Sequence, residues 1–184
     1  MKFLTFLFLA VNVFSQTNTC NLSFSNDKDY FTIDKNDLLC LAKNSNKRHT
    51  IFFTFASWCK PCRLHLPDAL YLEKTEDVEL YIVLPDSEGG KRLYQTLNFL
   101  KKNHPEAKRL VLKTTVYGTS LKQRNKNFVE DITPSKFEVI DDYSKFIVVN
   151  QKGEILFVSN WKDYDGDWKN GKAMMEKRIL PLLK

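Results

Sequence analysis

Short apolar runs alternate with amphipathic stretches along this chain. Residues 50–55 and 78–84 are apolar, β-branched and aromatic, a composition typical of buried strands. Farther along, Leu93, Leu97 and Leu100 recur at the spacing of one helical face. This part of the chain therefore predicts strands that alternate with helices.

The same pattern predicts the remaining elements. Asp34 can cap a helix that runs to about Ala42, and a helix after the strand at 50–55 reaches about Lys74 with a kink at Pro67. Strands and helices that alternate first, with a hairpin last, imply an α/β fold with a mixed central sheet flanked by helices. The other expected elements are a strand at 110–113, a helix or loop at 118–127, a hairpin of strands at 146–150 and 154–160, and a closing helix from Gly166 that is bent or ended by Pro181.

The first residues are typical of an export signal. Lys2 is followed by an apolar run over 3–14, and Ser15 offers a small residue for cleavage. The run is shorter than the about 20 residues that a membrane-spanning helix needs. We therefore expect a signal peptide at 1–15 that is removed on export to the periplasm or the cell exterior. An uncleaved segment would instead anchor the protein in the membrane, facing the periplasm.

The rest of the chain has the length and composition of one packed domain. The 184 residues are 43% hydrophobic and 13% aromatic, without an internal repeat. We expect a short N-terminal extension at 16–33 and one domain at 34–184. The formal net charge is +6, but the basic residues are scattered and form no Arg–aromatic nucleic-acid pattern. Solvated surface is the simplest interpretation, and attraction to acidic partners or to an anionic membrane is the alternative.

One motif carries chemistry: Trp58-Cys59-Lys60-Pro61-Cys62, where a predicted strand meets a predicted helix. Two cysteines with this spacing can form a small disulfide loop, and a helix N-terminus favours a thiolate. Lys60 adds a cation beside Cys59, and Pro61 suits a first helical turn because it needs no N–H partner. The expected chemistry is thiol–disulfide exchange, in which Cys59 attacks and Cys62 resolves the mixed disulfide.

Other side chains bear on this site. Trp58 is expected to shield the attacking sulfur and to offer partners an apolar contact. His65, three residues past Cys62, lies on the same side of the helix and could take the Cys62 proton; a surface or supporting histidine is an equal alternative. Asp86 and Glu88 end the next strand, where capping of the loop is favoured over an approach to the site.

No metal and no cofactor is expected. Cys59, Cys62 and His65 resemble part of a zinc site, but structural zinc takes four ligands and the remaining cysteines belong to a distant segment. A static structural disulfide between Cys59 and Cys62 is the other alternative to exchange chemistry. Such a short loop next to a tryptophan favours the catalytic interpretation.

Cys20 and Cys40 are predicted to form a second disulfide. In the first predicted helix Leu38, Leu41 and Ala42 share a face, and Cys40 lies nearly opposite to it. An exposed thiol in an oxidising compartment is vulnerable to oxidation. A disulfide that ties the extension to the helix is therefore favoured over two free thiols.

The element order and the cysteine motif resemble thioredoxin. More narrowly, Ala56-Ser57-Trp58-Cys59-Lys60-Pro61-Cys62, with Pro67 five residues farther on, is similar to the exported TlpA/ResA-like reductases of bacteria. The resemblance covers about 34–184 and implies a thioredoxin fold. It also implies a monomeric thiol–disulfide oxidoreductase that reduces disulfides of other exported proteins and is served by an unidentified redox partner.

The chain departs from the family's pattern at three positions. Phe53 replaces the buried carboxylate of thioredoxins, and His65 replaces a glutamate frequent in exported relatives. The cis-proline that precedes the hairpin in the family aligns with Ser144, or with Tyr143 when matched from upstream, so we expect a trans bond and a partner-docking loop without its usual proline. A thioredoxin-fold binding module with weak or no exchange is therefore the alternative function.

Overall fold

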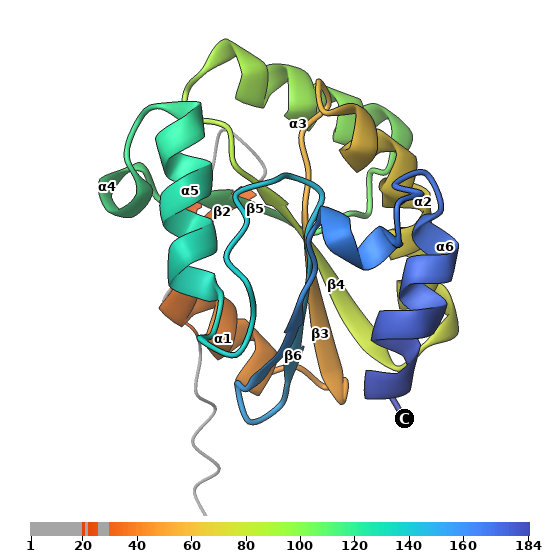
Figure 1. The fold of residues 1–184 in the computed structure, drawn as a ribbon. Coiled ribbons are helices and arrows are strands. Elements are labelled where there is room, and N and C mark those ends of the chain that lie inside the picture. Colours follow the sequence, from red (N-terminus) through yellow and green to blue (C-terminus); the bar gives the residue numbers. More distant parts are fainter. Residues whose placement is uncertain (1–19, 21, 26–29) are drawn as a thin grey trace, which may run out of the picture.

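The computed structural model describes residues 20, 22–25 and 30–184 (Figure 1). The expected signal peptide at 1–15 lies outside the described residues, as does the part of the extension at 16–19. Among the helices of the described part, none is both long and apolar enough to cross a bilayer.

The described residues form one mixed sheet of seven strands in the order β1-β2-β5-β4-β3-β6-β7. The inner strands β2, β5, β4 and β3 are parallel, while β1, β6 and β7 each run antiparallel to their neighbour. The expected mixed α/β architecture is confirmed. The strands are β1 (Ser23–Ser25), β2 (Tyr30–Ile33), β3 (His49–Thr54), β4 (Val78–Leu84), β5 (Arg109–Leu112), β6 (Phe146–Asn150) and β7 (Ile155–Val158).

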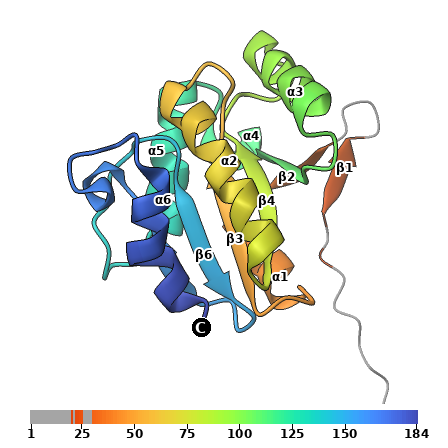
Figure 2. The ribbon, with the colours of Figure 1, turned by 90° about the vertical axis from the view of Figure 1, so that its right-hand side faces the viewer.

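Helices cover both faces of the sheet. Figure 2 shows α2 and α6 on one side, with α1 and α5 on the other. The segment at 118–127, which the sequence left open between helix and loop, contributes to α5. The helices are α1 (Lys35–Lys43), α2 (Lys60–Thr75), α3 (Lys91–Asn103), α4 (Thr114–Tyr117), α5 (Leu121–Ile132) and α6 (Gly171–Met174); a 3-10 turn (Trp161–Tyr164) precedes α6, and a π-turn (Met175–Ile179) and a second 3-10 turn (Leu180–Leu182) follow it.

Strand β3 separates two hydrophobic cores by the alternation of its side chains. Ile51 and Phe53 belong to the core beneath α2, α3 and α6, whereas Phe52 belongs to the core beneath α1 and α5. Phe53, which stands in place of the family's buried carboxylate, packs on Phe146 with ring centroids 4.7 Å apart. The carboxyl end of this doubly buried strand leads directly into the cysteine motif, so the sheet fixes the position of the site.

Local signals place the helices that flank β3. Asp34 caps α1 through a reciprocal capping box: its side chain accepts the Asp37 N–H at 3.1 Å, and the Asp37 carboxylate accepts the Asp34 N–H at 2.9 Å. Helix α2 continues through Pro67 to Thr75, as far as the sequence predicted.

The predicted closing helix from Gly166 is wrong at its start. Asp165 and Gly166 have φ angles of 51° and 88°, which a helix cannot contain. Helix α6 begins instead at Gly171, where the Asn170 side chain caps it by accepting the Ala173 N–H at 3.0 Å. The stretch at 161–170 is therefore a turn and loop, and Trp168 lies in this loop and not in a helix.

The described part of the N-terminal extension is built into the sheet. β1 and β2 form an antiparallel pair, and β2 then pairs in parallel with β5. Cys20 and Cys40 form a disulfide with their Cα atoms 5.8 Å apart, which ties the extension to α1.

Replacing both Cys20 and Cys40 by serine should lower the free energy of unfolding by about 3 kcal/mol, since the bond closes a loop with a sequence separation of 20. Urea unfolding of both proteins, each with Cys59 and Cys62 oxidised, measures the difference. Identical urea midpoints would contradict a stabilising role for this disulfide.

Candidate active site

The Cys59–Cys62 disulfide lies at the junction of β3 and α2. Cys59 is the N-cap of α2, and its sulfur accepts the Cys62 N–H at 3.2 Å. Pro61 is the second helical residue, where a missing N–H costs no helical hydrogen bond. Cys59 is 5% exposed and Cys62 is 0% exposed. Cys59 is therefore the sulfur that a partner can reach, and a helix N–H already points at it.

Trp58 lies beside this disulfide and is fixed on several sides. Its indole N–H donates to Asp86 Oδ1 at 3.1 Å, and Asp86 Oδ2 accepts the Thr96 hydroxyl at 3.3 Å. Tyr143 meets the indole in a T-shaped contact with ring centroids 5.1 Å apart, and the Arg92 guanidinium lies 5.6 Å from its centroid. Trp58 is thus a fixed, half-exposed wall next to Cys59.

Asp86 belongs to the site, so the expectation that it caps the loop is wrong. Its carboxylate is buried, and burial raises its pKa, while the hydrogen bond from Trp58 acts in the opposite direction. Glu88 does the capping instead, because its carboxylate accepts the Thr114 N–H at the start of α4, 2.8 Å away.

His65 is a buried junction of three segments, so the surface alternative is wrong. The ring is 1% exposed; its Nε2 lies 2.7 Å from the Trp168 carbonyl oxygen, and its Nδ1 lies 2.9 Å from Ser144 Oγ and 3.1 Å from Tyr164 Oη. A carbonyl oxygen only accepts, so Nε2 carries the hydrogen and Nδ1 accepts from the two hydroxyls. Burial lowers the pKa of His65, in agreement with this neutral form. We call these four residues the His65 junction.

Tyr143 and Ser144 lie in the loop before β6 and line the same cavity as Cys59. We call this segment the docking loop, and its contact with a partner stays a prediction. All peptide bonds of the described residues are trans, and Ser144 has a φ of 67°, which non-glycine residues adopt uncommonly. Next to it, Lys145 N–H donates to Thr54 Oγ1 at 2.7 Å, and Thr54 N–H donates to the Lys145 carbonyl at 2.9 Å. The loop is therefore joined to the end of β3 on one side and to His65 on the other.

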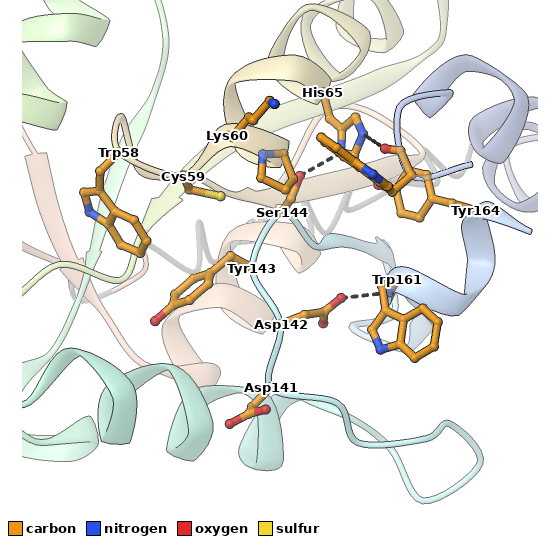
Figure 3. A pocket seen from close by; sticks show the side chains of 12 residues that line it. Trp58, Cys59, Lys60, His65, Asp141, Asp142, Tyr143, Ser144, Trp161 and Tyr164 are labelled. Carbon is orange, nitrogen blue, oxygen red and sulfur yellow. Dashed lines mark hydrogen bonds between the residues drawn. The ribbon is translucent and has the colours of Figure 1, made fainter. Parts of the chain in front are cut away.

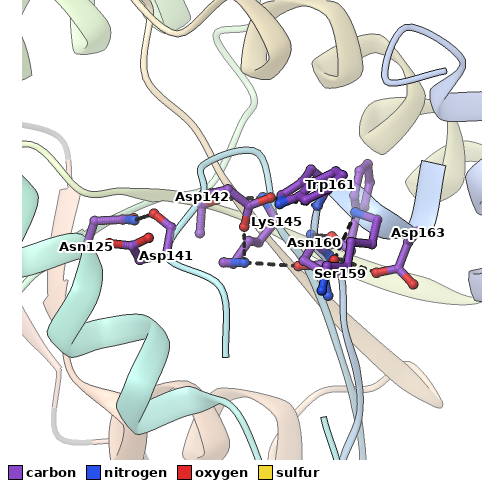
Figure 4. Close-up of polar contacts among 11 residues, drawn as sticks. Asn125, Asp141, Asp142, Lys145, Ser159, Asn160, Trp161 and Asp163 are labelled. Carbon is purple, nitrogen blue, oxygen red and sulfur yellow. Dashed lines mark hydrogen bonds and ion pairs between the residues drawn. The ribbon is translucent and has the colours of Figure 1, made fainter. Parts of the chain in front are cut away.

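A buried ion pair also fixes the docking loop (Figure 4). The Lys145 ammonium is buried, contacts Asp142 Oδ1 and donates to the Ser159 carbonyl at 3.1 Å. The other oxygen of Asp142 accepts the Trp161 N–H at 2.7 Å. Burial lowers the pKa of Lys145, and the adjacent Asp142 charge opposes this effect. We call Lys145, Asp142 and their contacts with Ser159 and Trp161 the Lys145 clamp.

A cavity of about 450 Å³ opens beside Cys59 (Figure 3). Its walls come from the cysteine motif and α2, from the docking loop, and from the turn and loop at 161–168. All three tryptophans of the chain, Trp58, Trp161 and Trp168, line it together with Tyr143 and Tyr164. A group that reaches Cys59 through this cavity therefore passes the aromatic lining.

The structure brings together most of the side chains that the sequence singled out. Lys60 is the first residue of α2, is exposed, and has its ammonium 5.7 Å from the Trp168 ring centroid. Its effect on the Cys59 pKa stays a prediction, as does the role of His65 as a base. Within the described residues, no three His, Cys, Asp or Glu side chains are grouped so that they could hold a metal ion.

Several residues that line the cavity were missing from the site predicted from the sequence. Trp161 and Tyr164 were overlooked because residues 161–165 were assigned to no element, and Trp168 because it was placed in the closing helix. The signal that could have found them is Trp161-Lys-Asp-Tyr-Asp-Gly-Asp-Trp168, in which aromatic residues alternate with turn-forming ones. Asp142 and Lys145 carried no local signal at all.

Comparison with known proteins gives structural likenesses only. No family model matches the chain, and no curated protein is similar to it in sequence. An uncharacterized thioredoxin-like protein from Porphyromonas gingivalis is 19% identical over 76% of this chain and 78% of its own, with a TM-score of 0.48. The thioredoxin domain of a thiol-disulfide oxidoreductase from Bacteroides vulgatus is 14% identical over 62% and 71%, with a TM-score of 0.43. An exposed lipoprotein thioredoxin from Streptococcus pneumoniae is 16% identical over 73% and 89%, with a TM-score of 0.40.

The architecture of the chain itself identifies the fold. Parallel strands joined by helices precede an antiparallel hairpin, β6–β7, and a closing helix, α6. The cysteine pair spans the N-cap and the first turn of the helix after β3, at the carboxyl end of an inner strand. The chain has the thioredoxin fold, with a mixed central sheet flanked by helices and a short N-terminal extension.

Proposed function

We propose that the protein is an exported thiol–disulfide oxidoreductase that reduces disulfides of other exported proteins through Cys59 and Cys62. The observation that supports this most directly is the position of Cys59: it is the N-cap of α2 and lines the aromatic cavity, with the buried Cys62 one turn behind it. Disulfide-containing exported proteins are the substrates in this proposal, and a redox partner restores the dithiol.

The proposed cycle begins with both cysteines reduced. The Cys59 thiolate attacks one sulfur of the partner's disulfide, a Cys59–partner bond forms, and the second partner sulfur leaves as a thiolate and takes up a proton. Cys62 then loses its proton and attacks the Cys59 sulfur, which releases the first partner sulfur. Two electrons have passed to the partner, and Cys59–Cys62 is a disulfide again. The Cys62 N–H supports the thiolate of Cys59 in the first step.

His65 has a positioning role in this proposal. Both of its ring nitrogens are engaged by groups other than Cys62, and these groups belong to the docking loop and to the turn and loop at 161–168. The ring therefore holds two walls of the cavity at α2. To act as a base for Cys62 it would first have to release the hydroxyls at Nδ1.

A binding module without exchange is the second candidate. The docking loop that lacks proline supports it, and the two functions differ in one respect: only the oxidoreductase forms a mixed disulfide that Cys62 resolves. The first experiment separates them.

Cys59→Ser should abolish reduction of a disulfide-bonded test protein such as insulin, because no accessible nucleophile remains. Cys62→Ser should still attack but should accumulate the mixed disulfide, since the resolving sulfur is gone. Non-reducing gels and mass spectrometry measure both effects, with the double serine variant as the control. Wild-type activity in Cys59→Ser, or equal capture by Cys62→Ser and the double variant, would refute the oxidoreductase.

The pH dependence of stability should report the neutral His65. Burial lowers its pKa in the folded protein, so as pH falls below about 6.5 the unfolded chain binds the proton first. The His65 contribution is therefore complete above that pH and is lost as pH falls towards the folded pKa. The slope contributed by one such group is at most about 1.4 kcal/mol per pH unit.

His65→Gln should flatten the fall of unfolding free energy between pH 7 and pH 5, measured by urea unfolding. His49 also has its pKa lowered by burial, so His49→Gln is the matched comparison and defines the contribution of that second group. A slope that is unchanged in His65→Gln, or an NMR titration of His65 at an ordinary pKa, would contradict the neutral, buried assignment.

A further inference from the structure

A basic surface adjoins the cavity at the start of α2. Lys60, Arg63 and Leu64 lie on the exposed side of the first helical turns, and Trp168 and Lys169 face them from the loop before α6. Together they line a shallow hollow of about 470 Å³. The ammonium groups of Lys60 and Lys169 lie 5.7 and 5.9 Å from the Trp168 ring centroid. We call these five residues the basic platform.

The cations of the basic platform have no neutralising carboxylate among the described residues. In the described part of the chain no ion pair joins Lys60, Arg63 or Lys169 to a carboxylate. Nearby lysines differ in this respect: Lys162 bridges to Glu138 at 2.6 Å and Lys177 to Asp165 at 2.5 Å. Three uncompensated positive charges therefore surround an apolar patch.

The platform also exposes apolar surface. Leu64 is 41% exposed, and Trp168 beside it is half-buried. Large apolar side chains of this kind, rimmed by charge, are typical of surfaces that bind other proteins. Trp168 belongs to both the platform and the cavity beside Cys59.

We infer that the basic platform docks an acidic segment of the partner polypeptide that flanks its disulfide. This inference rests on the proposed function and names the kind of substrate that the site takes. Lys60 and Trp168 line both the platform and the cavity of Cys59, so a chain that reaches Cys59 from this side crosses the platform. Carboxylates in that chain would meet Arg63, Lys169 and Lys60.

An anionic membrane is the competing occupant, and the geometry disfavours it. A bilayer that lay on the platform would also cover the mouth of the cavity, since Lys60 and Trp168 belong to both. It would then obstruct the approach of a protein disulfide to Cys59. A polypeptide segment, in contrast, can occupy the platform and the cavity at once.

Charge attraction of this kind acts mainly on the association rate and weakens with salt. The test uses three synthetic peptides with the same intramolecular disulfide, flanked by glutamate, glutamine or lysine. Reduction rates are measured at low and high ionic strength and divided by the rate for hydroxyethyl disulfide, an uncharged small disulfide. Wild-type protein should reduce the glutamate peptide about tenfold faster than the lysine peptide at low salt, and this preference should shrink at high salt.

The variant Arg63→Glu/Lys169→Glu should abolish or reverse this preference. The matched control is Lys74→Glu/Lys152→Glu, which changes the net charge equally. Lys74 lies at the far end of α2 and Lys152 in the turn between β6 and β7, away from the cysteines. The control should keep the wild-type preference. No preference in the wild type, or the same loss in both variants, would overturn the inference.

Two further measurements separate the remaining outcomes. If wild-type protein shows no Cys59-dependent exchange with hydroxyethyl disulfide, the proposed function fails. Binding of cysteine-free acidic and basic peptides to the platform is then measured by tryptophan fluorescence. Equal affinity for the acidic and the basic peptide would overturn the inference. Co-sedimentation with phosphatidylglycerol vesicles tests whether the platform binds an anionic membrane. Binding that is lost in Arg63→Glu/Lys169→Glu, without any peptide preference, assigns the platform to lipid and overturns the inference.

Discussion

The arrangement around Cys59 depends on the double hydrogen bonding of one buried imidazole. Because the ring is buried, a nitrogen left without a partner would cost about 1–3 kcal/mol, so both nitrogens constrain their neighbours. The Trp168 carbonyl fixes the hydrogen on Nε2, and this leaves Nδ1 to select hydroxyl donors, Ser144 and Tyr164. Three segments far apart in sequence are thereby held at one end of the sheet, and the cavity is the space between them.

In the docking loop, polar contacts hold the backbone conformation at a position where no proline restricts it. Ser144 adopts a left-handed conformation that its own side chain does not favour, and the His65 junction and the Lys145 clamp hold it from opposite sides. A buried ion pair contributes little net stability, since desolvation offsets the attraction between its charges. Its contribution here is positional, because Asp142 also accepts the Trp161 N–H and thereby ties the loop to the cavity wall.

Local signals in the sequence predicted the elements and the cysteines, but not the walls of the cavity. The apolar run at 50–55, the cap at Asp34 and the motif around Cys59 each depend on residues close in sequence, so their structures follow from short-range rules. The contacts of His65 span 79 to 103 residues and leave no such pattern. The helix expected from Gly166 was wrong at its start for a local reason: apolar spacing indicated a helix, but the left-handed residues at 165 and 166 cannot belong to one, and α6 begins at Gly171.

Charge is distributed unequally around the reactive sulfur. On the inner side, the carboxylate of Asp142 is matched by Lys145, and the carboxylate of Asp86 accepts hydrogen bonds from Trp58 and Thr96. On the outer side, Lys60 and Lys169 are without a carboxylate among the described residues. A thiolate at Cys59 would therefore experience the field of these cations on its solvent side. In the proposed function, this field would stabilise the attacking sulfur and would also attract a partner that carries negative charge near its disulfide.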